Sequence, residues 1–131
     1  MFAVLEELSD FAETMLASLA GPRAGRGRRF TRAYFEAWEA PVMGSQLRTL
    51  VRAAIGSPRA SRAFQEHLAA SLARSGISVS QHAGLMLAAS QLFGIAVVRY
   101  IIEVPVLVAL SIDELVQRLG PTIGKYLRTA E

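Results

Sequence analysis

AGLMLAASQLFGIAVV, residues 83–98, is the stretch that decides the fold of this chain. It carries no charge, and its apolar side chains would occupy more than one side of a helix. A helix of that kind must be covered on several sides, so we expect a central helix from about Ser80 to Glu103. The uncharged stretch is shorter than the roughly 18–20 residues that span a membrane, and Arg99 follows it closely. A buried helix is therefore preferred over a membrane-spanning one.

Helical spacing continues upstream of this segment. Apolar residues recur every three or four positions and predict helices over residues 2–19, 28–40, 47–56 and 58–74. Their expected boundaries lie at Gly21-Pro22, at Pro41, and at Ser57-Pro58, where serine would cap a helix whose first residue is proline. No segment alternates convincingly in the manner of a strand.

Downstream of the central helix, Val104 to Leu110 contains Pro105 and is predicted to be a connector. Ser111-Ile-Asp-Glu114 has the pattern of a capping box and opens a last helix, which Pro121 should kink. The sequence therefore predicts one all-α domain of about six helices over residues 1–131.

Composition narrows the class of protein. Of 131 residues, 52% are hydrophobic and 19% are charged, which excludes a disordered tail. The chain has no cysteine, so it is no disulfide scaffold and fits a reducing compartment. Its first ten residues hold acids where a secretion signal would have basic residues, so we expect a cytoplasmic protein. A chain this apolar should cover part of its surface with a partner or a membrane.

No set of side chains suggests catalysis or metal binding. His67 and His82 fall on different expected helices and in no metal-ligand spacing, so solvent-facing or capping roles are expected for both. Paired carboxylates lie at helix starts or on exposed helix faces. We therefore expect no enzyme, no metal and no cofactor.

Five arginines lie within residues 23–32 and form the main charge cluster. They could contact phosphate or an acidic partner, but no recognition element accompanies them. A solvated loop that enters a helix is the preferred interpretation.

Large soft side chains are spread over several expected helices. Aromatic residues and methionines that converge from separate helices can line a cavity for an apolar ligand, although ordinary core packing explains them equally well. Ser90 and Gln91 are polar groups in the helix expected to be most buried, so they should bond to neighbours, a partner subunit or a ligand.

Three segments carry a family resemblance: LASLAGPRAGRGRRFTRAYFEAWEAP (16–41), ASQLFGIAVVRYIIEVP (89–105) and SIDELVQRLGPTIGKYL (111–127). From Leu16 to Leu127 the chain resembles the C-terminal regulatory domain of the TetR (tetracycline-repressor) family of transcription regulators. Members pair this domain with an N-terminal helix-turn-helix headpiece, which this sequence lacks. The opening FAVLEEL resembles the helix that follows the headpiece, so this polypeptide alone should not bind DNA specifically.

The resemblance implies a homodimer in which the last two long helices of each subunit form a four-helix bundle. The implied interface residues are Leu92, Ile95, Arg99, Ile102, Leu115, Leu119 and Ile123. The resemblance also implies an effector pocket for an apolar or amphipathic small molecule. Its implied lining residues are Met15, Tyr34, Trp38, Phe64, Met86, Ser90 and Phe93. The alternative functions are a helical dimerisation module without a ligand and a small membrane-associated protein.

Overall fold

The computed structural model describes the backbone of residues 2–128 and the side chains of residues 8–128. Helices follow one another through this region, and it contains no strand. In chain order they are α1 (Phe2–Ala17), α2 (Arg26–Glu39), α3 (Pro41–Gly56), α4 (Pro58–Arg74), α5 (Val79–Ala96), the π-helical turn η1 (Val97–Ile101), α6 (Pro105–Val108) and α7 (Ile112–Arg128). The all-α class predicted from the sequence is confirmed.

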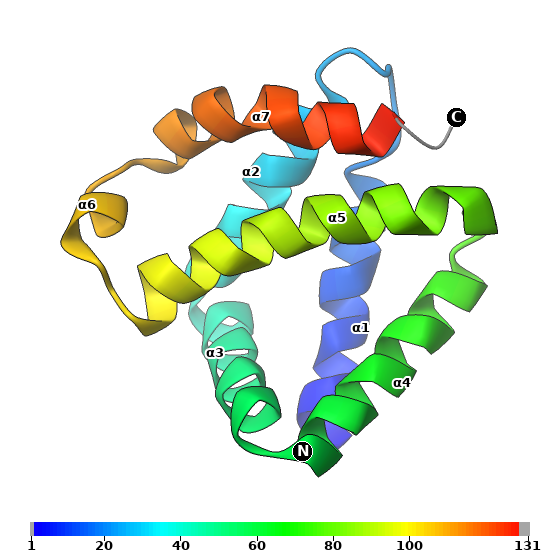
Figure 1. Cartoon of the computed structure of the whole chain (residues 1–131), viewed down its shortest axis with the longest axis vertical. Helices are drawn as coiled ribbons and strands as arrows, with labels where there is room; N and C mark the ends of the chain where they lie inside the picture. Colours follow the sequence, from blue (N-terminus) through cyan, green and yellow to red (C-terminus); the bar gives the residue numbers. More distant parts are fainter. Residues whose placement is uncertain (1, 129–131) are drawn as a thin grey trace.

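Helix α5 crosses the molecule and separates two groups of helices. Figure 1 shows α7 running alongside α5, with α1, α3 and α4 extending away from α5 in the opposite direction. Helix α2 packs most extensively against α7 and also contacts α1, α3 and α5, so it links the two groups. The interior that these helices enclose holds the candidate site.

Two helix starts follow the predicted capping chemistry. The Ser57 hydroxyl accepts a hydrogen bond from the backbone N–H of Ala60 at 3.2 Å, with Pro58 in the first turn of α4. The Ser111 hydroxyl accepts one from the N–H of Glu114 at 3.1 Å and opens α7. Each cap satisfies a backbone donor that the helix itself leaves free.

Two prolines begin helices where the sequence had predicted an end or a connector. Pro41 starts α3 directly after α2, and Pro105 starts the short helix α6 inside the expected connector. Both occupy the first turn, where the missing N–H of proline costs nothing. Pro121 lies inside α7, which continues through it to Arg128.

Helices α2 and α7 meet through glycines. A Cβ atom placed on Gly27 would lie 2.2 Å from the carbonyl oxygen of Gly120 and 2.4 Å from the nitrogen of Gly124. No larger residue fits at this crossing without moving a backbone. The contact fixes the position of α2, whose next turns carry the aromatic residues of the interior.

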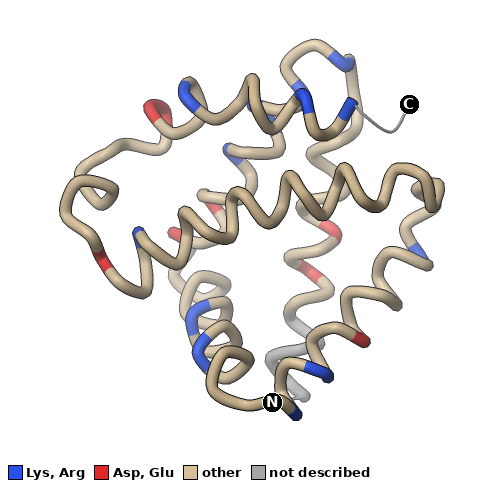
Figure 2. Tube along the Cα trace, in the orientation of Figure 1, with Lys and Arg blue, Asp and Glu red and all other residues tan. Residues whose placement is uncertain are grey.

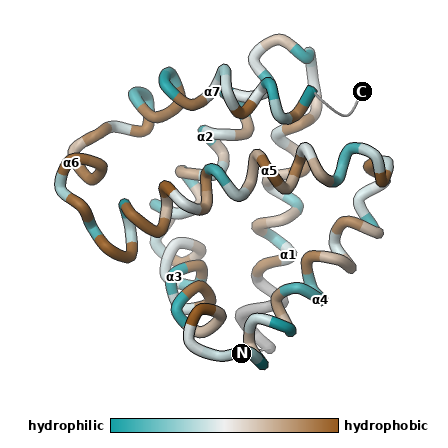
Figure 3. The backbone as a smooth tube through the Cα atoms, in the orientation of Figure 1, coloured by the Kyte–Doolittle hydropathy of each residue, from teal (hydrophilic) through white to brown (hydrophobic). Residues whose placement is uncertain are grey.

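Helix α5 is less covered than the sequence predicted. Of the described helices, α5 with η1 is the one long and apolar enough to cross a membrane, but only 28% of its most apolar window is buried. Figure 2 shows no charge along α5, and Figure 3 shows apolar stretches along it. Ser90 and Gln91, expected in a buried environment, are exposed. The helix therefore presents an uncharged outer face.

Candidate ligand pocket

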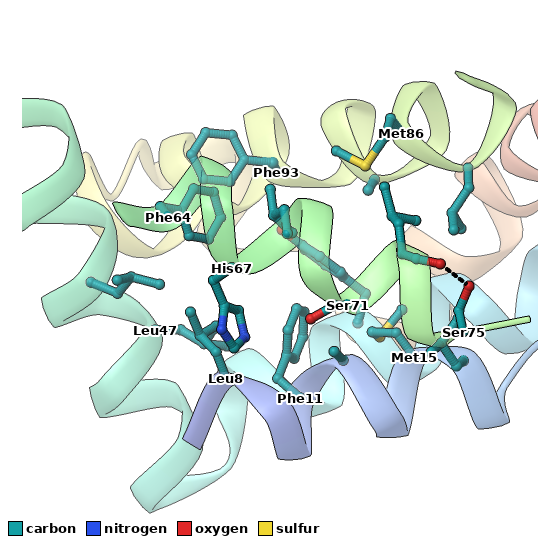
Figure 4. Close-up of a pocket in the computed structure, with 18 of the residues that line it drawn as sticks. Leu8, Phe11, Met15, Leu47, Phe64, His67, Ser71, Ser75, Met86 and Phe93 are labelled. Carbon is teal, nitrogen blue, oxygen red and sulfur yellow. Dashed lines mark hydrogen bonds between the residues drawn. The ribbon is translucent and has the colours of Figure 1, made fainter. Parts of the chain in front are cut away.

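An apolar cavity of about 140 Å³ lies among the first five helices. Helix α1 contributes Leu8, Phe11, Ala12, Met15 and Leu16, helix α2 contributes Phe30, Tyr34 and Trp38, and helix α3 contributes Leu47, Leu50 and Val51. Helix α4 and its cap contribute Phe64, His67, Leu68, Ser71, Leu72 and Ser75, and helix α5 contributes Leu85, Met86, Ala89 and Phe93. Among the lining residues that the structure describes there is no lysine, arginine, aspartate or glutamate. Figure 4 shows these side chains converging from separate helices.

The structure brings six of the seven predicted pocket residues together around this cavity: Met15, Tyr34, Trp38, Phe64, Met86 and Phe93. Ser90 is the exception. It is exposed, and its hydroxyl donates to the carbonyl of Met86 at 2.7 Å. The pocket-lining residues of α5 are Leu85, Met86, Ala89 and Phe93, and Ser90 follows Ala89 on the next position around the helix. A role for the six in ligand binding stays a prediction.

Aromatic contacts hold the wall that α2 provides. Trp38 is buried and stacks on Tyr100, with ring centroids 5.4 Å apart and planes 7° apart. Tyr34 meets Phe11 and Phe35 edge-on, at 5.6 and 5.7 Å between centroids. Burial raises the pKa of the Tyr34 hydroxyl, against a smaller lowering effect of Trp38, so it stays protonated at neutral pH. These packed rings form a preorganised side of the cavity.

Helix α4 supplies the polar atoms that sequence reasoning missed. The Nε2 atom of His67 and the Oγ atom of Ser71 are buried and have no hydrogen-bond partner within the described part of the chain. The Nε2 atom of His67 therefore does not face solvent or cap a helix as expected, although the residue as a whole is half-buried. Burial lowers the pKa of the His67 imidazole, with a smaller contribution from Arg74. His82 does cap the preceding turn: its Nε2 lies 3.0 Å from the Ile77 carbonyl oxygen.

A signal for His67 and Ser71 exists in the sequence. Both residues fall on the same helical face as Phe64 and Leu68, at spacings of three and four. Metal-ligand spacing alone does not reveal that His67 shares a helical face with these apolar residues. Among the described residues, no cluster of three metal-ligating side chains forms.

Arg99 was predicted at a dimer interface, but its own chain buries it. Its Nη1 donates to the carbonyl of Leu110 at 2.6 Å, and it also donates to those of Leu107 and Val108. Its Nη2 lies 3.2 Å from Oε2 of Glu39, at the end of α2. The guanidinium therefore ties the chain between α5 and α7 to α2, and the predicted interface role is corrected.

Three other predicted interface residues are likewise already covered. Leu92, Leu115 and Ile123 are at most 2% exposed and belong to the core of this chain. A side chain buried in its own subunit has no surface left for a second copy, so these assignments are wrong. Ile95 and Leu119 are half-buried against the core, and Ile102 is 62% exposed.

A different face of α5 is open. The outer stripe of α5 consists of four exposed residues one turn apart: Ala83, Leu87, Ser90 and Gly94. Leu87 is 50% exposed, and a Cβ placed on Gly94 would meet nothing within 4 Å. The stripe is apolar or small along its length and lies open in the single chain.

Arg29 and Arg32 of the arginine cluster show how it is held in the structure. Arg29 donates to the carbonyls of Pro22 and Ala24 at 2.6 and 3.1 Å and so closes the loop before α2. Arg32 donates to the carboxylate of Asp113 at 2.7 Å, between α2 and α7. These contacts support the interpretation of the cluster as a loop that enters a helix.

These features define an all-α domain built around an apolar cavity. Residues 24–127 match the family described as Tetracyclin repressor-like, C-terminal domain, and the chain belongs to this family. The resemblance noted in the sequence is thereby confirmed. No curated protein and no solved structure matches the chain.

Proposed function

We propose that this chain is the effector-binding and dimerisation domain of a TetR-like transcriptional regulator. It binds an apolar or amphipathic small molecule, acts without catalysis in the cytoplasm, and controls a DNA-binding headpiece that lies outside this sequence. The observation that carries the proposal is the cavity of about 140 Å³ between α1, α2, α3, α4 and α5.

The size and lining of the cavity suit a small apolar molecule. An engineered protein cavity of about 150 Å³ with an apolar lining stays dry and binds benzene. The cavity here has a similar volume and is lined almost entirely by aliphatic and aromatic side chains. A single-ring molecule would fill it and gain the contacts that an empty cavity lacks.

The outer stripe of α5 is the surface we assign to the dimer. It is uncharged and apolar or small, and Gly94 leaves room for a close helix approach. A second copy of α5, packed against this stripe with α7 beside it, would form the four-helix bundle. In this arrangement the second copy covers the uncharged outer stripe of α5, which would otherwise be exposed to solvent.

A path of contacts connects the cavity with the end of α5. Trp38 lines the cavity and stacks on Tyr100. The Tyr100 hydroxyl donates to Oε2 of Glu39 at 2.6 Å, and the same oxygen pairs with Arg99. A ligand that moves Trp38 can therefore bias the position of α5, provided that it binds two dimer arrangements with different affinity.

Calorimetric titration of the purified chain with toluene tests the proposed pocket. We expect saturable binding, and we expect the Ala89→Leu substitution to abolish it by filling the cavity. Ala70→Leu is the control, because Ala70 is exposed on α4 and does not line the cavity. Absence of toluene binding to the unaltered chain would favour a dimerisation module without a ligand.

A further inference from the structure

Two polar side chains stand on the cavity side of α4. His67 and Ser71 are four residues apart, so they lie on one helical face. Figure 4 shows both extending from α4 among the apolar side chains of the cavity. Both residues line the cavity, and neither His67 Nε2 nor Ser71 Oγ has a partner in the described structure.

The other polar groups of the cavity differ from this pair. The Ser75 hydroxyl donates to the carbonyl of Leu72 at 2.6 Å and accepts from the N–H of Ile77 at 3.1 Å. The Trp38 indole N–H also lacks a partner among the described residues, but it belongs to α2 and stands apart from the two groups on α4. His67 and Ser71 therefore form a pair of unpartnered groups on one helix face, within the part of the chain that the structure describes.

A buried polar atom without a hydrogen-bond partner lowers the stability of the folded chain by about 1–3 kcal/mol. Two such atoms on one helix face therefore indicate that a hydrogen-bonding group of a ligand occupies the space beside them. We propose that the cavity takes a small uncharged alcohol or phenol, whose hydroxyl accepts a hydrogen bond from Ser71 and donates one to His67. This inference rests on the proposed function and adds the chemical class of the effector.

A neutral hydroxyl fits these two atoms better than an ion does. With its proton on Nδ1, a neutral imidazole offers an acceptor at Nε2, and serine offers a donor. One hydroxyl group satisfies both. A carboxylate or an amine would enter a cavity whose described lining residues include no Lys, Arg, Asp or Glu, and burying an ion without a partner is strongly unfavourable. The lowered pKa of His67 agrees with a neutral ring in this site.

Toluene and phenol provide matched probes, because a hydroxyl replaces a methyl group on the same ring. Calorimetry gives the ratio of the toluene dissociation constant to the phenol dissociation constant for each protein. The loss of one or two hydrogen bonds to phenol lowers this ratio by a factor of roughly 3–30. We expect a decrease of that size in Ser71→Ala and in His67→Phe, because phenol should bind more weakly while toluene binding changes little. Ser90→Ala is the control, since that hydroxyl bonds within its own helix outside the cavity, and it should leave the ratio unchanged.

The outcomes separate this inference from the proposed function. If toluene and phenol both bind but the ratio is the same in all four proteins, the hydroxyl does not bond to this pair. The class assignment is then overturned, while the apolar pocket stands. Tighter binding of benzoate than of phenol would also overturn it, in favour of an anionic effector. If neither neutral probe binds, both the proposed pocket and the assignment of the effector class are overturned.

Ser71→Ala removes an unsatisfied hydroxyl and should fold at least as well as the parent chain.

Discussion

The guanidinium of Arg99 pairs with the carboxylate of Glu39 across 3.2 Å and joins η1, which continues α5, to the end of α2. Arg99 is 9% exposed and also holds three carbonyls of the segment between α5 and α7. Glu39 in turn accepts from Tyr100, which stacks on the cavity residue Trp38. A single arginine thus fixes the relation between the proposed pocket and the proposed dimer helix.

Replacing this arginine should destabilise the fold. We expect Arg99→Ala to lower the free energy of unfolding by about 2–4 kcal/mol, because several buried acceptors lose their donor together. Arg32→Ala is the matched control: its ion pair with Asp113 is exposed and should be worth about 1 kcal/mol or less. Urea unfolding of both variants measures the difference. Equal losses would show that Arg99 does not organise this region.

The glycine crossing of α2 and α7 makes a second prediction. Gly27→Ala places a Cβ within 2.2–2.6 Å of backbone atoms of α7, so we expect a loss of about 2 kcal/mol or more in unfolding free energy. Gly56→Ala, at the end of α3, meets nothing within 4 Å and should be neutral or slightly stabilising. Thermal unfolding compares the two variants. An unchanged melting temperature for Gly27→Ala would contradict the close approach.

The oligomeric state tests the outer stripe of α5. Leu87→Arg places a charge in the middle of the proposed interface, and we expect light scattering to show a monomer where the parent chain is a dimer. Val42→Arg, at a position on α3 that is 70% exposed, should leave the dimer intact. Ile123→Arg is no test of the interface, since Ile123 is fully buried and the substitution would unfold the chain. Dimers that survive Leu87→Arg would place the interface elsewhere.

Stability should depend on pH through His67. Its pKa is lowered in the folded chain, so below about pH 6.5 the unfolded chain binds a proton that the folded chain excludes. We therefore expect stability to fall as the pH drops from roughly 7.5 through 6.5, down to the folded-state pKa of His67. His67→Phe should lose this part of the pH dependence, whereas His82→Gln should retain it. Urea unfolding at several pH values gives the slopes, and identical slopes in parent and His67→Phe would refute the assignment.

Local signals predicted most of the fold. The caps at Ser57 and Ser111 and the apolar periodicity specify helices through neighbouring residues alone, and the structure confirms them. The roles of Pro41 and Pro105 were harder to predict, because a proline at a helix boundary can mark either the end of one helix or the first turn of the next.

The site was predictable only in part. Large side chains such as Trp38 and Phe64 revealed the region of the cavity, since they must converge somewhere in a small helical domain. The interface was not predictable in the same way. An apolar stripe on α5 does not say whether α7 of the same chain or a second copy covers it, and Leu92 and Ile123 proved to be internal.

The central claim is that the interior cavity accepts a small apolar ligand. The chain contains one tryptophan, Trp38, and it lines the cavity, so its indole N–H gives a single NMR signal that reports on the site. Titration of the chain with toluene, followed by this signal, tests the claim most directly. We expect a saturable shift that Ala89→Leu removes. A signal that stays unchanged up to the solubility limit of toluene in the unaltered chain would contradict it.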